Sequence, residues 1–187
     1  MRTRHSIPRD LFGKRRRVRR TRLETGLARY DQETFDERLD RLKWIEQIFP
    51  KGFFFTLPPE TFFVFSEAKD SFINGQPIAA VMLAGAFIEH VLTIELDRKG
   101  FHKEARGGMR SILRCLESNR AAITPLLKRI DDLQEIRNPY VHLKPYAHPA
   151  LLSQRSWKVG RRDYEVLEED AKSALSLMYT VATVRVW

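Results

Sequence analysis

The hydrophobic and polar positions of this chain recur with a helical period over most of its length. Apolar residues spaced three and four apart form one face of an α-helix, whereas strict alternation is typical of a strand. The helical spacing predicts helices at 31–49, 58–74, 78–96, 109–117, 124–137 and 163–187. The run 53–57 is apolar enough for a short strand, but no partner strand follows it, so we interpret it as a connector inserted into the core. The pattern therefore predicts an all-α fold.

The most apolar predicted helix, 78–96, is expected to lie at the centre of the core. Its unbroken apolar run, 78–88, is shorter than the roughly 18 residues that mark a membrane-spanning helix. Glu89 follows that run among apolar neighbours, where a carboxylate needs a partner. We expect this partner to be Arg137; the alternative is that Glu89 faces the surface.

The charge of the chain is unevenly distributed. The 187 residues include 33 Lys and Arg against 24 Asp and Glu, which gives a net charge of +9. Residues 1–30 hold eleven of the basic and two of the acidic residues, so this arm accounts for the whole excess. Few apolar side chains accompany these charges, which predicts a disordered arm.

The basic arm indicates contact with a polyanion. Lys and Arg side chains bind nucleic acid through its phosphates without reading its sequence. The candidate nucleic-acid contacts are Lys14, Arg15, Arg16, Arg17, Arg19, Arg20 and Arg22. The alternative is a solubilising tail or a targeting segment, although the arm lacks the apolar stretch of a secretory signal.

The pattern divides the chain into three parts: the arm, 1–30; a helix and apolar connector, 31–57; and a helical bundle, 58–187. The lone cysteine, Cys115, falls in an apolar periodic run, so we expect a buried structural thiol. No clustered Cys and His spacing indicates a metal site, and no cofactor is expected.

A short polar motif ends the helical run 124–137. It reads Arg137-Asn138-Pro139-Tyr140-Val141-His142. Because Pro139 lacks a backbone N–H and disfavours helical dihedrals in the preceding residue, one helix is expected to end near Arg137 and another to begin with Asn138 as its N-cap. Asn138 and His142, four residues apart, then share a face. A cation, an amide and an imidazole beside a helix N-terminus would suit a phosphate.

A plainer interpretation of the motif needs no ligand. Arg137 would pair with a carboxylate on its own helix, Asn138 would only cap a helix, and His142 would be a surface ring. The carboxylates close in sequence are Asp131, Asp132 and Glu135. Spacing alone leaves both interpretations open, because short motifs also match by chance.

The motif and its helical context resemble the HEPN superfamily. The likeness rests on Arg137-Asn138-x-x-x-His142 after a helical run and on the apolar helix 84–92 upstream, and it extends over 58–184. HEPN domains occur in bacterial toxin and antiphage systems and in RNA-processing enzymes. This chain resembles the uncharacterised bacterial HEPN-like proteins in particular. The resemblance implies an up-and-down helical bundle.

Active HEPN proteins are metal-independent endoribonucleases that act as dimers, with the motifs of two subunits facing each other. By this resemblance, Arg137 would stabilise the scissile phosphate while His142 acts as general base or acid. Asn138 would orient this pair, and Glu89 would support it. A helix N-terminus just upstream would favour the neutral, basic form of His142. Attack by the RNA 2′-hydroxyl would leave a 2′,3′-cyclic phosphate and a 5′-hydroxyl.

The resemblance also implies a cytoplasmic homodimer without membrane association, whose partners would be RNA and, for a toxin, an antitoxin protein. A second hypothesis is a noncatalytic HEPN-like module that binds nucleic acid or a partner protein, with the arm supplying contact. A third is a nucleotide-binding helper that acts beside a transferase. Cleavage of RNA, or its absence, distinguishes the first hypothesis from the other two.

Overall fold

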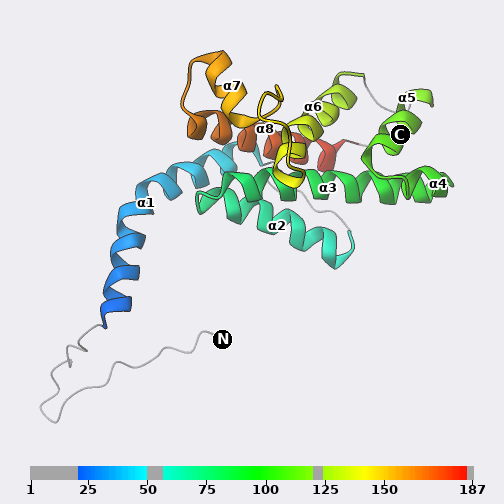
Figure 1. The fold of residues 1–187 in the computed structure, drawn as a ribbon. Helices are drawn as coiled ribbons and strands as arrows, with labels where there is room; N and C mark the ends of the chain where they lie inside the picture. Colours follow the sequence, from blue (N-terminus) through cyan, green and yellow to red (C-terminus); the bar gives the residue numbers. More distant parts are fainter. Residues whose placement is uncertain (1–20, 50–56, 120–123, 185–187) are drawn as a thin grey trace, which may run out of the picture. The chain divides into compact units, whose positions relative to one another are not determined.

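The computed structural model describes residues 21–49, 57–119 and 124–184 (Figure 1). Within these ranges every regular secondary-structure element is an α-helix. The helices are α1 (Arg22–Ile48), α2 (Pro59–Ile73), α3 (Pro77–Arg98), α4 (His102–Ala105), α5 (Met109–Ser118), α6 (Thr124–Val141), α7 (Leu152–Val159) and α8 (Asp163–Thr183). The predicted all-α class is therefore confirmed. Of the predicted connector, only Leu57 is among the described residues, and it packs against the core.

The chain forms two units, and the boundary between them falls within α1, after Glu37. The helix starts with a reciprocal cap. The Thr21 N–H donates to Glu24 Oε2 (2.6 Å), and the Glu24 N–H donates to Thr21 Oγ1 (3.2 Å). These bonds satisfy two amide groups that the start of a helix otherwise leaves unpaired. Residues 22–30 are thus helical, and the prediction of a disordered arm was wrong for them.

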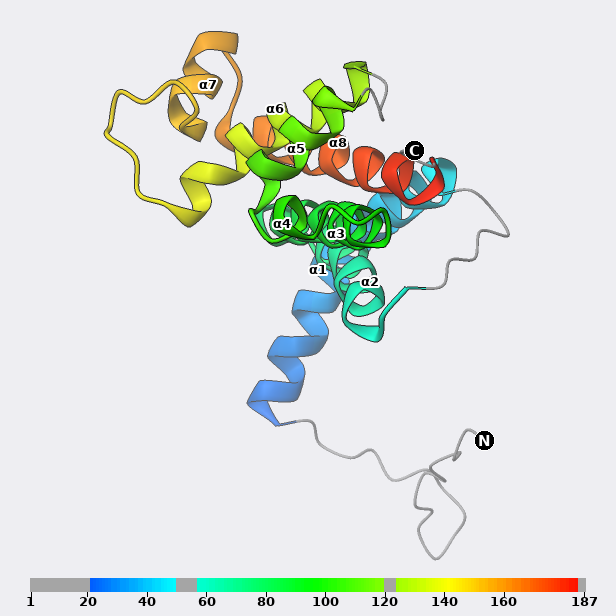
Figure 2. The ribbon, with the colours of Figure 1, turned by 90° about the vertical axis from the view of Figure 1, so that its right-hand side faces the viewer.

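α3 lies at the centre of the second unit, with α2 on one side and α8 on the other (Figure 2). Its side chains Phe87, Ile88, Leu92 and Leu96 are fully buried. By length and composition alone α3 would also pass for a membrane span, but half of its most apolar stretch is buried inside the protein. Packing against α2 and α8 accounts for the apolar run, so the predicted central core helix is confirmed.

The helices α5, α6 and α8 lie on the side of α3 opposite α2 (Figures 1 and 2). Each contributes a fully buried side chain to the core: Ile112 from α5, Ile130 from α6 and Leu175 from α8. Since α6 packs on both α3 and α8, its last turns, which carry the polar motif, are held against the body of the bundle.

Aromatic rings join the end of α1 to the bundle. The Trp44 ring lies 5.3 Å from that of Phe72 in α2, and the Phe49 ring lies 4.9 Å from that of Tyr179 in α8. Ile45 is buried, as its place on the predicted apolar face indicates, whereas Leu42 on the same face remains exposed.

Two short helices, α4 and α7, lie in segments where the apolar spacing predicts no helix. α7 is short, and its largest side chain, Trp157, is 85% exposed. The helix is held on α8 by Arg155, whose two terminal nitrogens donate to the two carboxylate oxygens of Asp170 at 2.8 and 2.5 Å. Hydrophobic periodicity cannot reveal a helix that a polar tertiary contact stabilises.

Tyr179 of α8 carries a buried hydroxyl that has no hydrogen-bond partner in the described part of the chain. Burial raises the pKa of this phenol far above its ordinary value, and the charge of Asp70 acts in the same direction. Because the folded protein then keeps a proton that the unfolded chain loses, the free energy of unfolding should fall by about 1.4 kcal/mol per pH unit above about pH 10. We expect Tyr179→Phe to remove this alkaline loss, as measured by urea unfolding across that range.

The matched control is Tyr30→Phe, because the Tyr30 ring is 56% exposed. It should leave the alkaline slope as in the wild type. At neutral pH, Tyr179→Phe should be at least as stable as the wild type, since it removes an unpaired buried hydroxyl. Equal alkaline slopes in the wild type and Tyr179→Phe would show that this phenol is not the source of the loss.

Candidate functional site

Arg137 directs its side chain from α6 towards α3. Its Nη1 atom lies 3.5 Å from Oε2 of Glu89, and the two side chains are 21% and 32% exposed. The pairing predicted from the apolar surroundings of Glu89 is therefore confirmed. It links two helices that are far apart in sequence, in contrast to the plainer interpretation in which Arg137 pairs along its own helix.

Gly85 makes room for this arginine. A Cβ atom at Gly85 would lie 3.0 Å from Cδ of Arg137, closer than an ordinary van der Waals contact. The Nε atom of Arg137 is buried and has no hydrogen-bond partner among the described residues. The pair with Glu89 and the close contact with Gly85 orient the guanidinium.

α6 continues through Pro139 to Val141, so the predicted helix break at the proline is wrong. A proline removes the hydrogen bond that its N–H would make to the carbonyl four residues earlier. That carbonyl belongs to Glu135, which is exposed, so water can bind it. Only two helical residues follow Pro139, and the missing bond therefore interrupts only the last turn.

The continuous helix changes the place of His142 in the fold. Asn138 is not an N-cap, and its carbonyl oxygen instead accepts a hydrogen bond from the His142 N–H at 2.9 Å. His142 thus follows the C-terminal end of α6. The expectation of a helix N-terminus just upstream of His142 was wrong.

Asn138 and His142 lie one helical turn apart, as their spacing predicts. Asn138 is half-buried and His142 is exposed. The guanidinium of Arg137 faces Glu89, and within the described ranges no hydrogen bond or ion pair joins it to the His142 ring. A single chain therefore brings Arg137 together with Glu89, and it does not show the expected convergence of Arg137 with His142.

Tyr140 lies inside the motif but was not among the predicted site residues. Its hydroxyl oxygen is buried and has no hydrogen-bond partner among the described residues. Burial raises the pKa of Tyr140, and the nearby positive charge of Arg155 opposes that shift. Arg155 is itself bound to Asp170, and this hydrogen-bonded contact raises the pKa of Arg155. Tyr140 thus lies near the Arg155–Asp170 pair of α7 and α8, and nothing in the sequence distinguishes it beyond its place in the motif.

The predicted nucleic-acid contacts of the arm are only partly visible. Lys14, Arg15, Arg16, Arg17, Arg19 and Arg20 lie outside the described residues. Arg22 is the first residue of α1 and is exposed.

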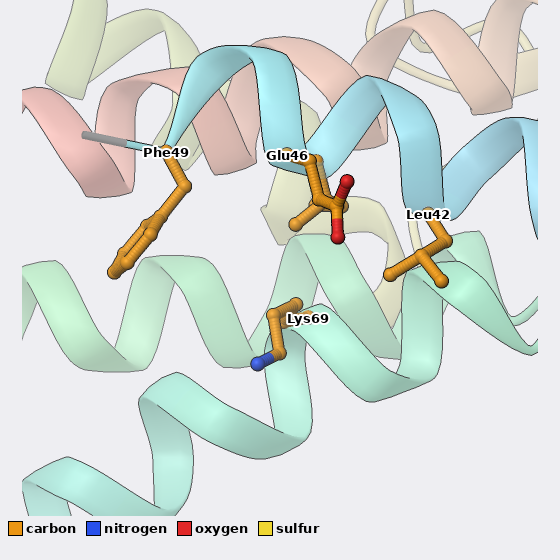
Figure 3. A pocket seen from close by; sticks show the side chains of 5 residues that line it. Leu42, Glu46, Phe49 and Lys69 are labelled. Carbon is orange, nitrogen blue, oxygen red and sulfur yellow. The ribbon is translucent and has the colours of Figure 1, made fainter. Parts of the chain in front are cut away.

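A hollow of about 380 Å³ lies between α1 and α2 (Figure 3). Leu42, Ile45 and Phe49 supply an apolar lining, and Glu46 and Lys69 add a charge of each sign. None of these residues belongs to the motif. The hollow is therefore a feature separate from the candidate site.

Other reactive groups are few. In the part of the chain that the structure describes, no three His, Cys, Asp or Glu side chains are grouped to hold a metal ion. Cys115 is buried in α5 as a free thiol, which confirms the predicted buried cysteine. Burial raises its pKa, and a raised pKa disfavours the thiolate that a nucleophile requires.

Comparison of the chain with models of protein families, with curated proteins and with solved structures finds no match.

Proposed function

We propose that this protein is a metal-independent endoribonuclease of the HEPN type, with its site at the end of α6. The observation that supports this most is the exposed imidazole of His142, one turn beyond the half-buried amide of Asn138. The adjacent Arg137 is held by Glu89 and by close contact with α3. An oriented guanidinium binds a phosphate, and an imidazole transfers protons near neutral pH.

In the proposed reaction the RNA 2′-hydroxyl attacks the adjacent phosphorus. His142 of one motif accepts the hydroxyl proton while the 2′ oxygen forms its bond to phosphorus and the P–O5′ bond breaks. A protonated imidazole delivers a proton to the departing 5′ oxygen. Arg137 stabilises the charge that gathers on the phosphoryl oxygens, and Asn138 orients the reacting groups. The products are a 2′,3′-cyclic phosphate and a 5′-hydroxyl.

A homodimer completes this proposed site. In one chain the Arg137 guanidinium faces α3 while His142 is exposed, so a second motif would supply the further cation and the second proton-transfer group. A protonated imidazole would take the acid role in one copy, and a neutral imidazole would take the base role in the other. We place the protein in the cytoplasm, acting on RNA as a toxin or antiphage effector with an antitoxin as its inhibitor.

Incubation of the purified full-length protein with a mixed RNA pool in EDTA tests the proposal. We expect fragments with 2′,3′-cyclic phosphate and 5′-hydroxyl ends, identified by end-group analysis. EDTA suppresses contaminating nucleases that need divalent metal ions. A parallel preparation of His142→Ala controls for contaminating metal-independent ribonucleases.

Lack of cleavage at high protein concentration, together with retained RNA binding, would overturn the ribonuclease and favour the noncatalytic binding module. Removal of residues 1–20 would then be expected to weaken binding and its salt dependence, because most of the excess positive charge lies there. This deletion keeps Thr21, which caps α1.

A further inference from the structure

The segment that follows the motif is positively charged. Between Arg137 and Arg162 there is no Asp or Glu. The basic residues of this segment are Arg137, Lys144, Arg155, Lys158, Arg161 and Arg162. Three of them are paired with carboxylates of α8, whereas among the described residues Lys144 and Lys158 form no ion pair. The loop 142–151 and α7 therefore present a surface suited to a polyanion.

Two large, exposed aromatic side chains belong to the same segment. Tyr146, in the loop, and Trp157, on α7, are each 85% exposed. The Gln154 side chain donates a hydrogen bond to the Tyr146 carbonyl oxygen at 3.2 Å. Gln154 and Trp157 are three residues apart and share a side of α7, so the loop brings Tyr146 to the side that carries Trp157. At this exposure both rings are accessible to a ligand.

Internal contacts hold this surface in place. The Ala150 N–H donates to His148 Nδ1 at 3.2 Å, and the His148 N–H donates to the Pro145 carbonyl oxygen at 2.9 Å. α7 is attached to α8 by the paired hydrogen bonds from Arg155 to Asp170. A surface that is already ordered loses less conformational entropy when it binds a ligand.

We propose that Tyr146 and Trp157 form a stacking platform for the bases of single-stranded RNA, with Lys144 and Lys158 contacting its phosphates. Aromatic rings stack on any base, and lysines bind the backbone without reading sequence. The absence of acidic side chains favours a polyanion over a protein partner, whose surface carries charges of both signs. The assignment rests on the proposed function, because the platform directly follows His142 and would guide the strand that the motif cleaves.

The test measures binding of the full chain to a single-stranded RNA of about 12 nucleotides, within the range such surfaces cover. Its 2′-hydroxyls are methylated, so the strand cannot be cleaved by 2′-hydroxyl attack. We expect Trp157→Ala and Tyr146→Ala each to raise Kd by roughly 5- to 150-fold. Quenching of tryptophan emission on binding should be lost in Trp157→Ala. Phe63→Ala, at a 61% exposed ring on α2, is the matched control and should bind as the wild type does.

Wild-type affinity in both Trp157→Ala and Tyr146→Ala would overturn the platform. Conversion of a dimer to a monomer by Trp157→Ala, with RNA affinity unchanged, would also overturn it and assign the surface to a second copy. If both variants bind RNA more weakly and the wild type does not cleave unmodified RNA, the stacking platform is supported and the proposed ribonuclease activity is overturned. If Trp157→Ala cleaves RNA with an unchanged KM, the stacking platform is overturned and the proposed ribonuclease activity is retained.

Discussion

Replacing His142 with alanine is expected to reduce the rate of RNA cleavage by about 10²- to 10⁴-fold, the range that general acid–base catalysis contributes. The loss should appear in kcat rather than KM, because the imidazole acts on protons in the transition state. His142 is exposed, and its ring makes no hydrogen bond with the described residues. The free energy of unfolding should therefore change by less than about 0.5 kcal/mol. Cleavage kinetics and thermal melting measure the two effects separately.

His102→Ala is the matched control for this variant. His102 is also an exposed histidine, on α4, and its ring is bound to Asp97 at 2.6 Å. It lies outside the motif and should cleave RNA at the wild-type rate. Wild-type kcat in purified His142→Ala would contradict the proposed chemistry, whereas equal losses in both histidine variants would indicate a general effect on the fold.

Replacing Asp170 with alanine is expected to lower the free energy of unfolding by about 3 kcal/mol. Asp170 accepts two hydrogen bonds from Arg155, and its side chain is only 9% exposed. Its removal leaves the partly buried guanidinium of Arg155 without its counter-charge and removes the contact that holds α7 on α8. Urea unfolding monitored by circular dichroism measures the change.

Glu169→Ala is the matched control, because Glu169 is the preceding residue on α8 and also binds an arginine, Arg161, at 2.6 Å. Its side chain is 63% exposed, so solvent screens the pair and little stability should be lost. The double variant Arg155→Met with Asp170→Leu should recover much of the loss, since apolar groups replace a buried ion pair well. Equal losses in Asp170→Ala and Glu169→Ala would contradict the structural role of Asp170.

The long helices were predictable because their apolar periodicity extends over several turns. The predicted helix 78–96 corresponds to α3, Pro77–Arg98, and the helix predicted from residue 163 corresponds to α8, Asp163–Thr183. Apolar burial stabilises these helices, so their sequences carry the signal. α7 lacks this signal because its stability comes from a polar contact with α8.

The start of α1 was missed for a different reason. The basic composition of residues 1–30 predicts disorder, but Thr21 and Glu24 form a reciprocal cap that begins the helix at Arg22. A Thr followed three residues later by Glu is a known helix-start signal. This local signal, beside the charge pattern, is sufficient to indicate the helix start.

By itself the sequence determined the all-α class and the central apolar helix. These follow from burial, because apolar periodicity sets the helices. The sequence predicted the pairing of Glu89 with Arg137 but left a surface-facing Glu89 open, and the contact between α3 and α6 decided it. Only the tertiary structure decided that α6 runs through Pro139, that His142 follows a helix C-terminus, and that the loop and α7 display exposed aromatic rings. These features depend on contacts between helices and with solvent, which residue spacing along one segment does not specify.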